Sequence, residues 1–510
     1  MKEFLKRLGH RVTGRRGIGN TVTVVIILAV VMLNVFAYTV TNAFGLYFYS
    51  PDVDDLSISG STDELFETAI RRGKKVTVTF CYAEDKLEQH DTGRFVLTTA
   101  REFQTRYPEL ITLRFVSLLT KMDANGAIVS LDKYTEGGKN ALMQNSVIFE
   151  SGEGEEWSCR VITDTASSAG FVDFYTLDSS ANILAYNGEE VMAAMISWVL
   201  QDEHPVAYFT QNHGESADVA FSNLLTCAGY YVEAINLRKS EIPADAGMVI
   251  ISNPTSDFER SVENANVRGE INKLEDYLKG GGKLYVALDP YVKELKNLEG
   301  LLKDYGISLA GDYNEHGVLV REIVKENSNA ITTDGYTFVA THADNAVSSD
   351  ILNRVQKYGN DRVLISQVTR LELDPALGAE PLLISSNTSS SHAGGDLIDD
   401  DGGYAVAAYS RRVEKDGKES TVFVIPTAYI TASDAFLSKS YSNKDFLYAT
   451  FEVLFDSNPA PRGCNTVMYR TSVIENLTMG RAKTYTALIL AIPAMIAVLG
   501  AVTIIRRKNR

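Results

Sequence analysis

The residues best suited to chemistry lie in one short segment, QNHGE at 211–215. Its histidine, His213, could act as a general acid or base, and Glu215 could orient that imidazole or serve as a ligand. Asp289 ends another apolar segment and is a candidate for the same group. Together these three side chains would supply the acid–base groups of a hydrolytic site.

Two neighbours extend this candidate group. Asn212 precedes the histidine, and Asp218 follows it within a segment expected to be helical. If the group binds a ligand without catalysing a reaction, its candidate residues are Asn212, His213, Glu215 and Asp289.

A structural interpretation of the same segment is favoured. Gly214 provides a turn, and Glu215 and Ser216 cap the helix that follows. No nucleophile accompanies the histidine, because the sequence has no Gly-x-Ser-x-Gly elbow, no His-Glu-x-x-His and no Walker A motif. The glycines at 280–282 precede a strand instead of following one, so they cannot cradle a phosphate at a helix N-terminus. We therefore predict no catalytic residue, no metal site and no cofactor.

The elements that position this segment alternate regularly. Residues 206–210 (VAYFT) have the β-branched and aromatic composition of a strand, and QNHGE follows them directly. Further strands and helices are expected in alternation, the strands at 231–237, 248–252 and 283–289 and the helices at 216–228, 268–279 and 292–305. This alternation predicts a doubly wound α/β domain over 204–456, with its site at the carboxyl ends of the strands.

A first α/β domain, also of the doubly wound type, is expected at 60–200. Strands at 76–82 and 111–118 are separated by a helix at 92–106, which makes a βαβ unit and implies a parallel sheet. An amphipathic helix is predicted within 183–200. In the second domain, the polar stretch 386–403 is predicted to be a loop.

Charge is distributed unevenly along the 510 residues. The net charge is −16, but residues 1–20 carry +5 and the last five residues carry +4, which leaves −25 for the region between them. A strongly acidic chain repels phosphate backbones, so nucleic-acid binding is excluded. The length exceeds what one hydrophobic core usually supports, so at least two domains are expected.

Each basic end adjoins an uncharged apolar run, at 21–49 and 484–505. Both runs reach the roughly 20 residues that a helix needs to cross a bilayer. A cleaved signal peptide is the alternative for the first run, but its apolar core would span only about 7–15 residues. Because basic residues favour the cytoplasmic side, tails 1–20 and 506–510 are expected inside the cell. We therefore predict a two-pass cell-membrane protein with both α/β domains extracytoplasmic and a linker at 457–483.

Four cysteines show no metal-ligand spacing: Cys81, Cys159, Cys227 and Cys464. Domains of this size do not need disulfides for stability. We interpret these residues as buried free thiols, although four cysteines also allow three disulfide pairings.

Short segments spread over residues 60–505 match one family pattern. They include NGEE at 187–190 followed by the helix MAAMISWVL, the strand and turn VAYFTQNHGE, Asn253-Pro254, the helix-Gly-Gly-Lys-strand of 271–288 and the NKDFL segment at 443–447. With the flanking apolar runs, these segments resemble the GldG-like family of ABC-transporter auxiliary proteins. The family commonly has a Gly-His-Gly-Glu turn, and this chain carries Asn212 in place of the first glycine.

The resemblance implies an extracytoplasmic α/β module that works beside an ATPase and a permease and has no established catalysis. We accordingly expect a non-catalytic accessory or binding component of an ABC-type transport system. Its partners would be the permease and ATPase subunits and membrane lipid. The alternatives are a cell-surface hydrolase that uses His213, Glu215 and Asp289, and a structural envelope protein.

Overall fold

The described part of the chain covers most of the acidic region. The computed structural model describes Met32 and residues 56–123, 125–135, 142–163, 171–177, 182–217, 219–261, 268–414, 416–432, 435–436 and 440–468. Pro51–Val467 form one compact unit. Both predicted spans, the two basic tails and Asp218 lie outside the described residues, apart from Met32 in the first span. Within the described ranges, no helix has the length and apolar character needed to cross a membrane.

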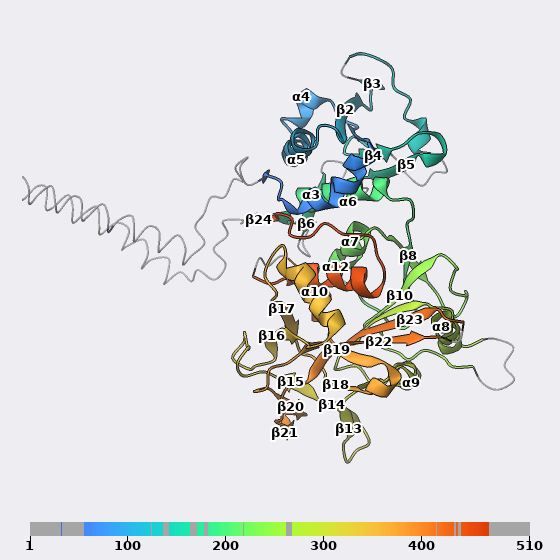
Figure 1. Ribbon diagram of the computed structural model, residues 1–510, viewed down its shortest axis with the longest axis vertical. Coiled ribbons are helices and arrows are strands. Elements are labelled where there is room, and N and C mark those ends of the chain that lie inside the picture. The colour runs from blue at the N-terminus through green and yellow to red at the C-terminus, as the bar shows by residue number, and fades with distance from the viewer. Residues whose placement is uncertain are drawn as a thin grey trace, which may run out of the picture. The chain divides into compact units, whose positions relative to one another are not determined.

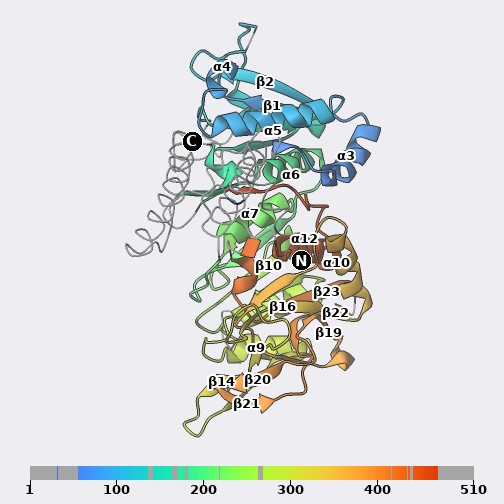
Figure 2. The same cartoon turned by 90° about the vertical axis from the view of Figure 1, so that its left-hand side faces the viewer.

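The first part of this unit is a five-stranded sheet with helices on one face (Figures 1 and 2). The elements run in the order α3 (Ser61–Arg71), β1 (Val76–Phe80), α4 (Glu84–Leu87), α5 (Gly93–Arg106), β2 (Ile111–Ser117), β3 (Met122–Asp123), β4 (Val147–Ser151), β5 (Ser158–Ile162), β6 (Tyr175–Leu177), β7 (Ile183–Tyr186) and α6 (Gly188–Leu200). Helix α5 packs on β2, α6 packs on β4 and β5, and the two helices contact each other.

The doubly wound prediction is wrong for this first sheet. Its strand order is β3-β2-β1-β4-β5, and of these pairs only β1–β2 is parallel. The chain makes one crossover through α5 between parallel strands, whereas β4 and β5 join antiparallel. Gly152 and Gly154 allow the β4–β5 turn, because both adopt positive φ, at 72° and 62°.

A larger mixed sheet forms the second part of the unit. Its first half contains β8 (Val206–Thr210), α7 (Val219–Cys227), β9 (Tyr231–Ile235), β10 (Ala246–Ser252), α8 (Glu270–Lys279), β11 (Lys283–Ala287) and α9 (Lys296–Asp304), and its last parallel strand is β23 (Glu419–Ile425). The strands β9-β8-β10-β11-β23 are all parallel. In chain order this arrangement is 2-1-3-4-5, which is a doubly wound order. The α/β expectation is therefore confirmed here.

Antiparallel strands extend this sheet beyond β23, and the sequence did not indicate that they pair with the parallel strands. The neighbours in order are β22 (Ala405–Val413), β19 (Ala379–Ile384), β16 (Thr337–His342) and β17 (Val363–Ser366). Shorter elements surround them: β12 (Ile307–Leu309), β13 (Gly311–Tyr313), β14 (Leu319–Arg321), β15 (Ile323–Lys325), β18 (Leu371–Leu373), β20 (Ser390–Ala393) and β21 (Asp396–Asp399). The predicted loop 386–403 thus contains the hairpin β20–β21, whose turn at Gly394 and Gly395 uses two positive φ angles.

Helices cover both faces of the large sheet (Figure 1). One face packs against α7, α10 (Ala346–Gln356) and α12 (Asn443–Leu454) through buried residues such as Phe221, Ile351 and Phe451. The other face packs against α8 and α9 through Leu274 and Leu298. Both sheet faces are consequently apolar, as a central parallel sheet requires.

The four cysteines are free, as predicted, but only Cys81 is buried, and Cys159, Cys227 and Cys464 are half-buried. Burial raises the pKa values of Cys81, Cys159 and Cys227 to about 12, so these thiols stay protonated and unreactive at neutral pH.

Candidate functional site

The QNHGE segment lies where the strand order of the large sheet reverses. From β8 the chain passes through α7 to β9 on one side and then crosses to β10 on the other, so the ends of β8 and β10 flank this point. Doubly wound proteins bind ligands at such switch points. The sequence predicted that QNHGE lies at the carboxyl edge of the sheet, and the structure places the segment there.

Two turns are tied together at this edge. The carbonyl oxygen of His213 accepts hydrogen bonds from Thr255 N at 2.7 Å and Ser256 N at 2.9 Å. Ser216 N donates to Ser252 O at 3.0 Å, and Ser252 Oγ donates back to Ser216 O at 2.7 Å. The turns after β8 and β10 therefore fill the edge with their own hydrogen bonds.

The imidazole of His213 is completely buried between two carboxylates. Its Nδ1 lies 3.1 Å from Glu215 Oε1, and its Nε2 lies 2.9 Å from Glu270 Oε2. One ring face stacks on Phe258 at a centroid distance of 3.9 Å. Because both ring nitrogens are engaged and the ring has no exposed surface, His213 cannot exchange a proton with a substrate in this conformation.

The electrostatics favour a protonated histidine. Burial by itself lowers the pKa of His213, but the hydrogen bond that the ring donates to Glu215 and the charge of Glu270 outweigh it, and the pKa is raised above 6.5. Burial likewise opposes ionisation of Glu215, yet its hydrogen bonds to the ring and the backbone N of His213 leave its pKa lowered. The carboxylates on both sides of the ring favour its imidazolium form, and we call this group the His213 triad, comprising Glu215, His213 and Glu270.

The cap prediction for Glu215 and Ser216 is wrong. Helix α7 begins only at Val219, and the second carboxylate oxygen of Glu215 accepts the backbone N–H of His213 at 2.7 Å. Ser216 is held by β10 instead of capping the helix. The glycine prediction is confirmed: Gly214 has φ of 74°, and a Cβ there would lie 2.0 Å from Thr255 Oγ1.

The structure does not join Asp289 to the histidine. Asp289 follows β11, and its Oδ1 accepts the backbone N–H of Tyr291 at 2.8 Å in a local turn. Both nitrogens of His213 are occupied by other carboxylates, so Asp289 is not its acid–base partner. Asn212 is exposed and adopts a φ of 84°, which makes it a backbone position of the left-handed region.

A second group, which sequence analysis did not propose as a site, lies at the start of α6. Glu189 is buried, and its Oε1 accepts the backbone N–H of Ser59 at 2.7 Å while its Oε2 accepts that of Asn465 at 2.7 Å. Asn465 Nδ2 also donates to Ser57 O at 3.0 Å. We call these contacts the Glu189 clamp. It joins the first described residues of the unit to its last ones.

The adjacent residue makes a different connection. Glu190 is buried and accepts hydrogen bonds from Lys444 Nζ at 2.7 Å and Tyr448 OH at 2.8 Å, both on α12. Burial alone lowers the pKa of Lys444, but the charge of Glu190 more than compensates and raises it. The NGEE segment therefore attaches α6 to α12. Its only signal in the sequence was two consecutive carboxylates in an otherwise apolar helix.

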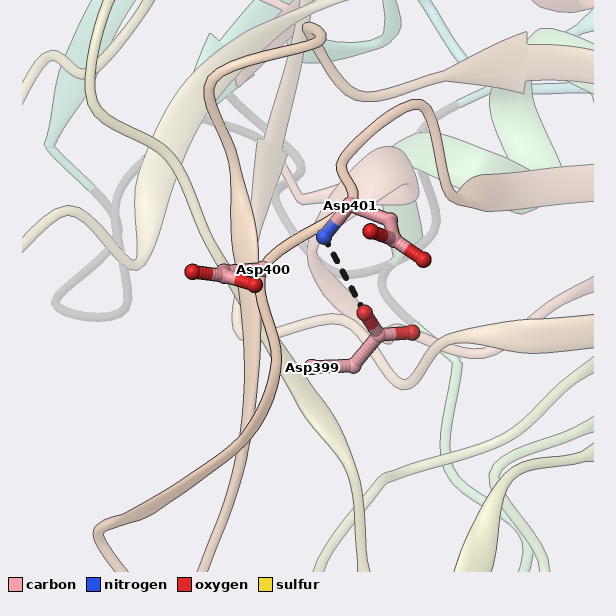
Figure 3. A group of neighbouring side chains, drawn as sticks. All are labelled: Asp399, Asp400 and Asp401. Atoms are coloured by element: carbon pink, nitrogen blue, oxygen red, sulfur yellow. Dashed lines mark hydrogen bonds between the residues drawn. The ribbon is translucent and has the colours of Figure 1, made fainter.

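Residues beyond these groups offer weaker candidates. Asp399, Asp400 and Asp401 gather on the surface at the end of β21 (Figure 3), but Asp399 accepts Asp401 N at 3.0 Å and pairs with Arg370 at 2.8 Å. Surface carboxylates of which one is already paired do not define a cation site. A cleft of about 430 Å³ is lined by His342, whose pKa burial lowers to about 4, so this imidazole is neutral.

Comparisons with known proteins add little. No protein-family model matches the sequence, and no curated protein sequence matches it. Among solved structures, the mmIFT52 N-terminal domain is similar over 49% of this chain and 97% of its own, with 14% identity and a TM-score of 0.36. A putative ThuA-like protein from Bacteroides uniformis is similar over 51% of this chain and 97% of its own, with 14% identity and a TM-score of 0.29. PurLQS from Thermotoga maritima is similar over 49% of this chain and 98% of its own, with 11% identity and a TM-score of 0.27. Similarities of this size assign no function.

The His213 triad predicts a specific pH dependence of stability. Because the pKa of folded His213 is raised above 6.5, its stabilising contribution is complete below pH 6.5 and is lost as the pH rises through the folded-state value. Glu215 has a lowered pKa, so its contribution is present above pH 4.5 and is lost as the pH falls through its folded value. Replacing His213→Gln leaves Glu215 without its cation and leaves Glu270 with only the longer contact to Arg238 Nε at 3.7 Å. We expect a loss of about 3–5 kcal/mol in the free energy of unfolding between these limits.

Denaturant unfolding of the native chain and the variant across this pH range measures the effect. The stability difference should shrink as the pH rises above neutrality. His316→Gln, at an exposed position, is the matched control and should leave the pH profile unchanged. A stability difference that stays constant at all pH values would show that the imidazolium does not hold the triad together.

The backbone at position 212 predicts which substitutions the turn accepts. A φ of 84° suits Gly and Asn but strains a β-branched residue. Asn212→Gly should change stability by less than about 1 kcal/mol, and Asn212→Val should cost about 1–2 kcal/mol or more. Thermal denaturation of both variants tests this. If Asn212→Gly kept its stability but lost cellular function, the side chain would have a role in ligand binding.

Proposed function

We propose that the chain is a membrane-anchored, extracytoplasmic accessory or binding component of an ABC-type transport system, of the GldG-like kind that its sequence resembles. It does not catalyse a reaction itself in this proposal, and a separate subunit hydrolyses ATP. The observation that supports it best is the Glu189 clamp. Asn465 and Ser57, which lie near the two ends of the folded unit, are within hydrogen-bond distance of each other.

This closeness suits a module attached to a membrane at both ends. The predicted spans at 21–49 and 484–505 flank the clamp in sequence, so both connections would leave the folded unit from one point. Two spans are too few to form a transport pathway alone, so a separate multi-span permease is required. The proposal places both basic tails in the cytoplasm and the acidic unit outside.

The rival hydrolase loses its main residue in this structure. His213 is buried, both its nitrogens are bonded to carboxylates, and Asp289 takes part in a separate turn. A general base must lie within hydrogen-bond reach of the proton that it abstracts. The alternative of a structural envelope protein predicts no transporter partner. An experiment that looks for such partners therefore separates it from the proposal.

Purification of the full chain from membranes in mild detergent tests the partner prediction. We expect mass spectrometry to identify an ATPase and a multi-span permease that co-purify with the chain. An unrelated two-pass protein purified in parallel controls for abundant membrane contaminants. If neither subunit is enriched over that control, the transport proposal fails and the structural envelope role gains support.

Labelling of single cysteines in intact cells tests the membrane topology. The native thiols at 81, 159 and 227 are buried or half-buried with raised pKa values, so they should react slowly. We expect an impermeant maleimide to label Lys279→Cys, on an exposed position of α8, without permeabilisation. Arg510→Cys should react only after the membrane is opened. Labelling of Arg510→Cys in unbroken cells would contradict the topology.

A further inference from the structure

A cavity of about 420 Å³ lies between α3 and α6 on one side and α10, α12 and residues 459–462 on the other. Both walls belong to the same compact unit. Its size is in the range of small-molecule sites, and such sites often form where two lobes of a protein meet. The cavity is separate from the His213 triad, because it shares no residue with it.

The cavity walls carry more positive than negative side chains. Four cations line it, namely Arg72, Lys74, Arg354 and Arg462, against two carboxylates, Glu64 and Glu452. The chain as a whole carries −16. Two of these cations are paired with carboxylates outside the wall, Lys74 with Asp202 at 3.4 Å and Arg354 with Asp350 at 3.3 Å. Arg72 is the wall cation that has no ion pair among the described residues, and its charge attracts anions to this place.

Both carboxylates are already neutralised by protein groups. The side chain of Glu452 is only 4% exposed, and it accepts hydrogen bonds from Arg354 Nη1 at 2.9 Å and Arg462 Nη1 at 2.5 Å. Glu64 pairs with Lys357 and also accepts a hydrogen bond from the hydroxyl of Tyr358. Glu452 therefore pairs with two of the four wall cations, whereas Glu64 pairs with Lys357, and neither carboxylate pairs with Arg72.

Two guanidinium groups retain donors for a ligand. Arg72, at the C-terminal end of α3, makes no ion pair with any described residue. Arg462 bonds to Glu452 through Nη1, but its Nε is buried and has no hydrogen-bond partner among the described residues. A buried polar atom without a partner indicates that a water, an ion or a ligand completes the site. Guanidinium groups match the oxygen geometry of carboxylates and phosphates.

We propose that this cavity binds a small molecule through an oxyanion, a carboxylate or a phosphate, held by Arg72 and Arg462. The site lies between the part of the unit that carries α3 and the part that carries α12, so a bound anion bridges the two. The inference does not depend on a transporter partner, and it can fail or succeed independently of the proposed function.

Isothermal titration calorimetry of the full chain in detergent at low ionic strength tests the site. The probes are inorganic phosphate and succinate, so the two sources of oxyanion are distinguished by which probe binds more tightly. We expect saturable binding of at least one probe, with a dissociation constant in about the millimolar range or below. Absence of saturable binding of both probes up to about 20 mM would overturn the proposal.

Adjacent arginines supply a matched pair of variants. Arg72→Gln should weaken binding at least about fivefold, which corresponds to loss of one charge-assisted contact of about 1 kcal/mol. Arg71→Gln removes the same charge one residue away, outside the cavity, and should change affinity less than about twofold. Arg72 is exposed and has no ion pair in the described structure, so the variant should keep its melting temperature. Equal loss in both variants would show general attraction to positive charge and would contradict a defined site.

Discussion

Two consecutive buried carboxylates at the start of α6 connect the parts of this structure. Glu189 and Glu190 lie in the first turn of the helix, where the helix dipole favours negative charge. Each points to a different partner, and together they join the chain ends to each other and α6 to α12. Burial raises the pKa of Glu189 despite three hydrogen bonds, so its ionised form is held there at a cost in stability. We interpret the pair as specifying how the parts meet more than as strengthening the fold.

The His213 triad is also held together by buried carboxylates, but here they surround a histidine at the edge of the large sheet. Burying a charged histidine is unfavourable unless opposite charges surround it, and Glu215 and Glu270 meet this condition. The result fixes the turn after β8 against α8 at the point where related folds place their ligands. A histidine whose sequence context suggests catalysis therefore has a structural role at the edge of the sheet, because both its ring nitrogens bond to carboxylates.

Local patterns predicted the parallel half of the large sheet because each strand and helix there follows its neighbour at regular spacing. The antiparallel strands β16, β17, β19 and β22 were harder, since their pairing depends on partners distant in sequence and not on local periodicity. The hairpin β20–β21 was missed although Gly394-Gly395 is a two-residue turn signal, because the flanking residues are polar instead of alternating. In the first sheet, the βαβ unit of β1, α5 and β2 was predicted correctly, but extending its parallel arrangement to the whole sheet was wrong.

Among the site residues, too, local positions could be predicted from the sequence, but partners distant in the chain could not. The position of QNHGE at a strand end was readable, but the partner of His213 lies 57 residues away, and Glu190 meets Lys444 across 254 residues. Only the topology brings such pairs together. The burial of His213 against Phe258 is likewise a property of packing that no motif encodes, and the carboxylates of Glu215 and Glu270 that raise its pKa are brought to the ring by the same packing.

Hydrogen–deuterium exchange of the full chain tests the central claim that one carboxylate joins both ends of the folded unit. Glu189→Gln replaces one acceptor oxygen with an amide that faces N–H donors, while Glu67→Gln on an exposed face of α3 serves as the control. If the Glu189 clamp operates as described, exchange should speed up about tenfold or more in both segments, 57–60 and 464–467, in the Glu189 variant alone. Faster exchange in only one segment, or in neither, would contradict it.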